Sequence, residues 1–338
     1  MTTDERRRLQ LAVGLAVAAV ALVAAGLAAG SEGWSVRNLA GALGNPDGRF
    51  IVLEIRAPRT LGAWLTGALL GLSGAIAQGL FRNPLADPYL LGSASGAVLG
   101  VVLVLAAAAL GGHAVSVATA DAIARVGLVG AAFAGALAGV LLTLSLARGA
   151  QETTRLLLAG VVVGVVLSAS SDLVTTAAPD ALRGKQAFLL GSTGFLGWQS
   201  CAFMGLGLAV TLPVAWRLAR VLDALTLGTE TAVSLGLALG RVRVALVAAL
   251  ALATGIAVSQ AGLVAFVGLV SPHLVRRFAP AAHGYGLVAS AAAGGTLLLA
   301  ADVLARSVIA PQEVPVGVVT ALLGGGYLVW LLRRRQRT

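Results

Sequence analysis

This sequence predicts an all-α polytopic membrane protein with about ten transmembrane helices, because of its composition, its apolar runs and its loop charges. Of the 338 residues, 58% are hydrophobic and only 11% are charged, and the mean hydropathy is +0.92. Soluble domains are about 25% charged and about 45–50% apolar. A water-soluble fold of this composition would have too few polar side chains to cover its surface. A lipid bilayer is therefore the expected solvent. The 44 glycines suit it, because small residues let helices approach closely in lipid.

Ten apolar runs, each bounded by charged residues or by Pro and Gly clusters, supply the candidate spans. They cover residues 9–30, 61–81, 89–110, 122–147, 156–178, 198–216, 242–260, 261–275, 284–305 and 314–332. The first run is long for the apolar core of a cleaved signal peptide, so it is interpreted as a span. Pro272 is expected to break the eighth, which makes residues 261–278 a functional candidate, unless they form only a tilted or re-entrant packing helix. All ten belong to a single transmembrane domain, residues 1–338.

Loop charges orient the predicted spans. An even number of spans places both termini on one side of the membrane. With the termini in the cytoplasm, two thirds of the 24 Lys and Arg residues fall on the inner side, and an excess of this kind is typical of cytoplasmic loops. The sequence therefore predicts a multi-pass protein with both termini in the cytoplasm. Its net charge of +10 reflects this topology and does not indicate nucleic-acid binding.

Small residues four positions apart recur in the predicted spans and indicate faces where helices cross closely. The pairs are Gly67 and Gly71, Gly135 and Gly139, and Gly160 and Gly164. A faint similarity between residues 71–84 and 255–272 further suggests that spans two to five and seven to ten are repeats of opposite orientation.

Recognisable catalytic and metal-binding motifs are missing from the sequence. Lys185 is the only lysine, and Gln186 follows it where a phosphate-binding loop needs Ser or Thr. Cys201 is the only cysteine, and the three histidines are far apart, so no metal site is expected. The chain is therefore not expected to be an enzyme. A gradient-driven transporter would need ionisable groups within the membrane, and Asp172 and Asp302 are the candidates for that alternative function.

Several stretches of the sequence resemble one known family. They are RAPR (residues 56–59), GLSGAIAQGLFRNPLADPYLLGSASGA (71–97), TTRLLLAG (153–160), LGTETAVSLG (227–236), GLVAFVGLVSPHLVRR (262–277) and ADVLARSVIAPQEVPVGVVTALLGG (301–325). RNPLADP, FVGLVSPH and PVGVVTALLG, in this order and at this spacing, are highly specific. The chain thus resembles the permease subunits of ATP-binding-cassette importers for iron-siderophores, haem or cobalamin, the FecCD/BtuC-like family.

The resemblance implies a permease that moves its cargo across the bacterial cytoplasmic membrane by alternating access. It also implies ten helices per subunit and three kinds of partner: a second permease copy or a paralogue (a homodimer is expected), two cytoplasmic ATPase subunits, and an extracytoplasmic substrate-binding protein. ATP and Mg²⁺ would bind the ATPase subunits, and this chain is expected to hold no cofactor. The shared motifs do not distinguish iron-siderophore, haem and cobalamin. His273 is interpreted as structural, in preference to a haem ligand.

The resemblance further assigns candidate residues at the two membrane faces. Those for docking of the binding protein on the external side are Arg56, Arg59 and Arg306, unless these side chains only reach toward the membrane surface. Those for a cytoplasmic gate are Asn83, Leu85, Thr153 and Thr154, unless these residues serve helix contacts alone.

Coupling to the ATPase is assigned to a cytoplasmic segment at about residues 217–243, where residues 227–236 are expected to form a short helix. The alternative is an ordinary solvated loop helix. The candidate coupling residues are Leu227, Gly228, Glu230, Ala232, Leu235 and Gly236.

Overall fold

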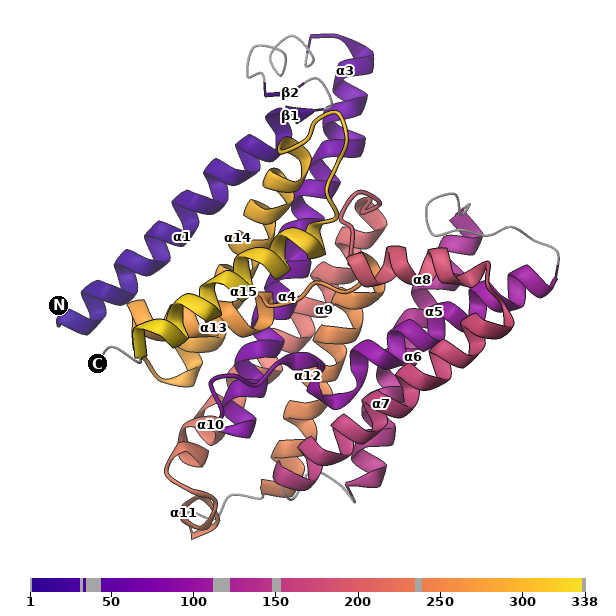
Figure 1. Cartoon of the computed structure of the whole chain (residues 1–338). Helices are drawn as coiled ribbons and strands as arrows, with labels where there is room; N and C mark the ends of the chain where they lie inside the picture. Colours follow the sequence, from indigo (N-terminus) through magenta and orange to yellow (C-terminus); the bar gives the residue numbers. More distant parts are fainter. Residues whose placement is uncertain are drawn as a thin grey trace.

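The protein is a bundle of helices in the computed structural model, which describes residues 2–30, 33–34, 44–111, 122–147, 153–234 and 239–335 (Figure 1). The long helices are α1 (Thr3–Ala28), α4 (Ala57–Phe81), α5 (Ser93–Leu110), α6 (Ala122–Leu146), α7 (Thr153–Ala177), α9 (Trp198–Arg217), α12 (Leu239–Ala261), α14 (His283–Ser307) and α15 (Val316–Arg335). The shorter helices are α3 (Pro46–Phe50), η1 (Ile51–Arg56), η2 (Pro88–Leu91), α8 (Ala181–Leu190), α10 (Ala219–Thr226), α11 (Thr229–Ser234) and α13 (Val267–Phe278). One antiparallel strand pair, β1 (Ala29–Gly30) and β2 (Gly33–Trp34), follows α1.

Eight helices of the described residues are long and apolar enough to cross a membrane, and they match predicted spans one to seven and nine. The tenth predicted span falls on α15, whose apolar part, Val316–Leu331, is shorter. The second span begins earlier than predicted, because α3 and η1 continue into α4 without a break. Pro58 has no N–H to donate in the first turn of α4. The π-helical turn of η1 precedes it, with the N–H of Ala57 bonding the carbonyl of Val52.

α4 and α14 form the centre of the bundle and touch through their backbones. A Cβ atom added at Gly67 would lie 2.2 Å from the carbonyl oxygen of Gly294, and one at Gly71 would lie 2.2 Å from that of Ser290. Within the most apolar stretch of each helix, 89% of the residues are buried for Pro46–Phe81 and 72% for α14, against 22% for α7. α4 and α14 are therefore interior helices, whereas α7 lies on the perimeter.

The other predicted glycine faces are also helix contacts. A Cβ atom at Gly135 would lie 2.2 Å from the carbonyl oxygen of Gly96 on α5, and one at Gly160 would lie 2.0 Å from that of Leu90. The prediction of close crossings is confirmed for every predicted glycine except Gly164, where an added Cβ atom would meet only Oγ of Ser95, at 3.7 Å. The reason is steric, because no larger residue fits between backbones at these distances.

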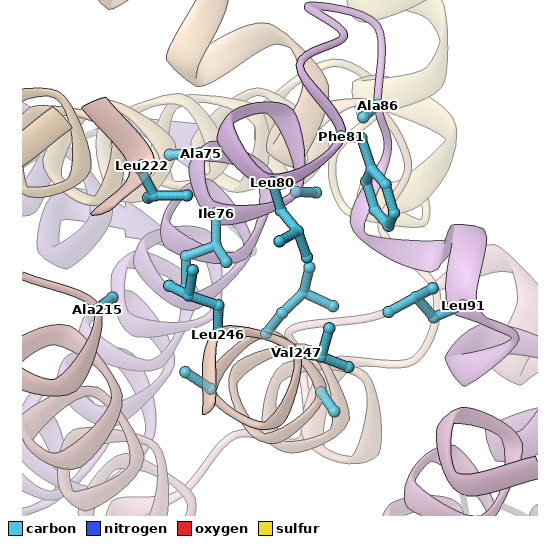
Figure 2. Close-up of a cluster of buried hydrophobic side chains, with 14 of the residues drawn as sticks. Ala75, Ile76, Leu80, Phe81, Ala86, Leu91, Ala215, Leu222, Leu246 and Val247 are labelled. Carbon is cyan, nitrogen blue, oxygen red and sulfur yellow. The ribbon is translucent and has the colours of Figure 1, made fainter. Parts of the chain in front are cut away.

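One hydrophobic cluster surrounds the last turns of α4, and Figure 2 shows part of it. Ile76 and Leu80 of α4 point toward Leu246 and Val247 of α12. Leu222 of α10 lies beside them and is fully buried. α10 is therefore anchored on the membrane helices and is not a free loop segment.

The eighth predicted span is not a single broken helix. Residues 262–266 are not helical, and Gly262 and Phe266 have positive φ angles of 69° and 67°. α13 begins after them and has 12 residues, about 18 Å of helix, which is too short to cross a hydrocarbon core of about 30 Å. The prediction that Pro272 causes the break is wrong, because Pro272 lies inside α13.

The non-helical segment 262–266 meets the connection between α4 and α5, which contains the short 3₁₀ helix η2, inside the bundle. In this connection the Tyr89 hydroxyl donates to the carbonyl of Val264 at 3.0 Å. Close to this contact, a Cβ atom at Gly268 would lie 2.7 Å from the ring of Pro88. Non-helical backbone at membrane depth is tolerated where protein satisfies its polar groups, as the Tyr89 hydroxyl does here. The segments stand in corresponding places of the two suggested repeats, and the repeat itself stays a prediction.

Candidate functional site

An arginine cluster lies where α4 begins and α14 ends. The Nε and Nη2 atoms of Arg59 donate to Oδ1 of Asp302 at 3.3 and 3.2 Å. Its Nη1 and Nη2 atoms also donate to the two carboxylate oxygens of Glu313, both at 2.8 Å. Paired, parallel N–H···O bonds of this kind are the strongest geometry that a guanidinium and a carboxylate can adopt.

Asp302 is the buried centre of this cluster, with a side chain that is 0% exposed. Arg306, one helical turn further along α14, forms an ion pair with its second oxygen. The Thr193 hydroxyl donates to Oδ1 at 2.5 Å. A buried carboxylate is tolerated only when it is paired and hydrogen-bonded, and Arg59, Arg306 and Thr193 together meet that requirement.

The three predicted docking arginines lie together, but they differ in exposure. Arg306 is buried, and its Nη1 atom donates to the carbonyl of Gly26 at 3.1 Å. Arg56 is half-buried and donates to the carbonyl of Leu27 at 3.0 Å. All three line a recess of about 170 Å³. We call it the arginine recess, and its lining residues are Ala29, Ile51, Ile55, Arg56, Arg59, Arg306, Pro311 and Glu313.

The two acids proposed for gradient-driven transport are both held in ion pairs. Asp302 faces two guanidinium groups, as described above. Asp172, on α7, pairs with Lys185 of α8, and its side chain is 72% exposed. Asp302 is therefore neutralised by two buried or half-buried arginines, and Asp172 is open to its surroundings in one copy of the chain.

The predicted gate residues lie at the opposite end of the bundle, on two elements. Arg82 ends α4 in the left-handed conformation. In the turn that follows, the side-chain oxygen of Asn83 accepts the N–H of Leu85 at 2.9 Å, and Leu85 is 54% exposed. Thr153 and Thr154 begin α7. Among the described residues, no hydrogen bond joins them to Asn83 or Leu85 within one copy of the chain.

The predicted coupling segment lies at this same end, and α11 forms the lower tip of the molecule in Figure 1. Ala232 is fully buried in the cluster that also holds Leu80 and Phe81 of α4. Leu227 is 68% exposed, and Glu230 is exposed as well. α11 is thus fixed by one face and open on the other. Leu235 and Gly236, the last two predicted coupling residues, lie outside the described residues.

A contact that the sequence did not indicate ties α10 to α14. Asp223 of α10 accepts the backbone N–H of His283 at 2.9 Å, and the same oxygen lies 2.6 Å from its Nδ1 atom. His283 is the first residue of α14, so Asp223 places a carboxylate at a helix N-terminus, where the helix dipole favours negative charge. The two residues are 60 positions apart, and neither belongs to a motif that could have revealed the pair.

A groove on the perimeter runs along α7. Its volume is about 580 Å³, and small and hydroxyl residues line much of it, including Ser95, Gly160, Gly164 and Ser168. The Ser168 hydroxyl donates to that of Ser95 at 3.1 Å. Side chains of this size could pass a bulky molecule without binding it tightly.

Comparisons with known proteins agree with this arrangement. The model of the FecCD transport family matches residues 17–334. The hemin transport system permease protein HmuU of Yersinia pestis is 38% identical over 288 residues, which is 85% of this chain and 84% of that protein. The vitamin B12 import system permease protein BtuC of Escherichia coli O9:H4 (strain HS) is 39% identical over 293 residues, 86% of each protein. A solved structure, an inward-facing conformation of a metal-chelate type ABC transporter, aligns with a TM-score of 0.82 and 26% identity over 95% of this chain and 98% of that one.

These matches confirm the predicted family and the all-α permease fold, and they favour an importer permease over a gradient-driven transporter. The roles of the individual docking, gate and coupling residues stay predictions. With a family match across residues 17–334 and relatives of this identity and coverage, the chain belongs to the FecCD transport family.

Proposed function

We propose that this permease carries an iron-siderophore, haem or cobalamin into the cytoplasm by alternating access, and that partner subunits hydrolyse the ATP that drives it. The observation that carries the proposal is the placement of two candidate contact surfaces at opposite ends of α4 and α14. The arginine recess lies at one end, and α11 with the turn at residues 83–85 lies at the other. A partner that delivers cargo and a partner that hydrolyses ATP act on opposite sides of a membrane. Two contact surfaces at opposite ends of the bundle match that arrangement.

The end that carries α11 is assigned to the cytoplasm. The Tyr285 hydroxyl donates to the carbonyl of Arg8 at 2.9 Å, so α1 begins at this end. Arg277, at the end of α13, lies over the ring of Trp330 on α15 at 5.2 Å, so α15 ends nearby. Both helices carry arginines at these ends, which supports a cytoplasmic location by the positive-inside rule.

The recess end then faces an extracytoplasmic binding protein, with Arg56 and Arg59 as the docking cations. Arg306 is too deeply buried to reach a partner directly, so its role in docking is to hold Asp302 and thereby Arg59. Exposed ion pairs each contribute only about 0–1 kcal/mol. Complementary charge across an interface nevertheless raises the association rate and fixes orientation.

α11 is the proposed contact for a cytoplasmic ATPase subunit, which would bind ATP and Mg²⁺. Leu227, just before α11, and Glu230, on it, offer an apolar and an acidic side chain to that partner. Ala232 is buried in the cluster that includes residues of α4 and α12, and α11 packs on α10. Gly228 connects α10 to α11 with a φ angle of 111°, a conformation that favours glycine. Phe81 and Ala86, on either side of the Asn83–Leu85 turn, belong to the same cluster, so a movement of α11 would reach the turn through them.

A second copy of the chain is proposed to complete the cargo pathway. α7 presents exposed apolar side chains, among them Val161, Val165 and Leu173, beside the groove lined by Ser95 and Ser168. Two such faces across a two-fold axis would enclose a passage of mainly small and apolar side chains, with the carboxyl groups of Asp87 and Asp172 also on the groove. The gate would then combine the 83–85 turn and the start of α7 from both copies.

Reconstitution with the ATPase subunits in nanodiscs tests the proposal. ATP hydrolysis is measured with and without binding protein loaded with a ferric siderophore, haem or cobalamin. We expect Glu230→Lys to reduce the stimulation about five-fold or more, the lower bound of typical coupling between sites. Asp4→Lys, an exposed acid at the same end on α1, is the control and should leave stimulation intact.

Two results would contradict the proposal. If stimulation is unchanged in both Glu230→Lys and Gly228→Ala, α11 does not couple the ATPase. If an uncoupler abolishes uptake at constant ATP, transport is driven by an ion gradient.

A further inference from the structure

We propose that Glu313 is a built-in counterion of Arg59. It pairs with the Nη1 and Nη2 atoms until an acidic side chain of the binding protein displaces it. The inference rests on the proposed docking role of the arginine recess. It assigns to Glu313, on the segment between α14 and α15, the regulation of that surface.

The hydrogen-bond capacity of Arg59 requires such an exchange. A guanidinium has five N–H donors. The Nε–H donates to Asp302, both Nη2 hydrogens are used by Asp302 and Glu313, and one Nη1 hydrogen is used by Glu313. A single N–H therefore remains. An incoming carboxylate can gain a two-bond contact with Arg59 only if one of these two acids leaves.

Glu313 is the acid that can leave. Its side chain is 47% exposed, whereas that of Asp302 is 0% exposed. Within the described part of the chain, the Glu313 carboxylate is hydrogen-bonded to Arg59 alone. Asp302 is held as well by Arg306 and Thr193. Releasing Glu313 returns one carboxylate to water, whereas releasing Asp302 would strand buried charges.

The size and charge of the recess fit one acidic side chain. Its volume of about 170 Å³ corresponds to about five or six water molecules. The recess carries three arginines, Arg56, Arg59 and Arg306, and two carboxylates pair with them, Glu313 on the lining and Asp302 buried behind it, which leaves an excess of one positive charge. With Glu313 turned away, the excess is two. The recess then attracts a partner carboxylate more strongly.

The device would hold Arg59 in place between docking events. Glu313 and the partner's acid use the same two N–H groups, so the exchange replaces one ion pair by another of the same kind. The exchange therefore makes docking weaker and more reversible without preventing it. Weaker docking would let the binding protein dissociate from the permease after it has delivered its cargo.

The test measures association of the binding protein that stimulates ATP hydrolysis with the reconstituted full complex, at several salt concentrations. We expect Glu313→Gln to raise the association constant about two- to five-fold at low salt, the scale of an exposed ion pair, and the gain to shrink as salt screens it. Glu54→Gln is the matched control, an exposed acid on η1 that does not line the recess, and it should give a smaller change.

A double substitution separates this inference from the docking proposal. If Glu313 acts through Arg59, the gain from Glu313→Gln disappears in the Arg59→Gln background. Docking itself is wrong if Arg56→Glu combined with Arg59→Glu leaves association unchanged. If that pair weakens association but Glu313→Gln does not strengthen it in a protein with unaltered thermal unfolding, docking stands and the counterion role is overturned. A destabilised Glu313→Gln is replaced by Glu313→Ser, to which the same criterion applies.

Discussion

Gly67→Ala tests the close backbone contact between α4 and α14. The added Cβ would lie 2.2 Å from the carbonyl oxygen of Gly294 and 2.7 Å from Cβ of Leu298, where ordinary contact begins at 3.4 Å. The helices would have to separate by about 1 Å, since the obstructing atom is backbone and cannot rotate away. Overpacking a well-packed interior costs about 1–3 kcal/mol. We expect the upper part of that range because both sides of the contact are buried.

Gly14→Ala is the matched control for this prediction. Gly14 lies in the middle of α1 and has no atom within 4 Å of an added Cβ. Both substitutions gain the same helix propensity, about 1 kcal/mol, so the difference between the variants measures the clash. The assay is thermal unfolding in one detergent, where we expect Gly67→Ala to unfold roughly 5 °C or more below Gly14→Ala. Equal unfolding midpoints would refute the close contact.

Two further substitutions test the ends of α14. Arg306→Gln should cost about 3–5 kcal/mol of stability, because the buried Asp302 carboxylate loses one of its counterions. Arg56 is half-buried and bonds only a carbonyl among the contacts described, so Arg56→Gln should cost about 1 kcal/mol. Equal thermal stability of the two variants would argue against the buried network. Asp223→Asn removes the carboxylate from His283, so we expect a loss of about 1 kcal/mol and reduced stimulation of ATP hydrolysis with basal hydrolysis retained. Unchanged stimulation would show that the α10–α14 contact is only structural.

Helix positions could be predicted from the sequence because lipid leaves a backbone few alternatives. Every backbone polar group in the bilayer must be hydrogen-bonded within the protein. An apolar run of about 20 residues therefore forms a helix whatever other helices it packs against. The eighth span shows the limit of this rule. Phe266 has a left-handed conformation and packs closely against Gly324 of α15, a contact between residues far apart in the sequence. No local feature of an apolar, bulky residue indicates it.

The candidate site could be predicted only in part. Motif resemblance identified the three arginines, and the structure places them in one recess. The resemblance could not show that the Arg306 side chain points inward or that Glu313 forms an ion pair with Arg59, since Glu313 and Arg59 are 254 residues apart in the sequence. Contacts over such distances depend on how α4 and α14 meet. The glycines indicate that these helices cross closely with others, but not which helices they meet.

α14 connects the two ends of the molecule. At the recess end it carries Asp302, which holds Arg59, and at the other end Asp223 holds its first residue, His283. Between them its backbone touches that of α4, with no layer of flexible side chains that could absorb a shift. Close-packed interiors transmit strain, so a movement that an ATPase passes from α11 to α10 would reach the Arg59 contacts through one continuous helix. That is why we expect Asp223→Asn to lose stimulation by the binding protein and to keep its basal hydrolysis.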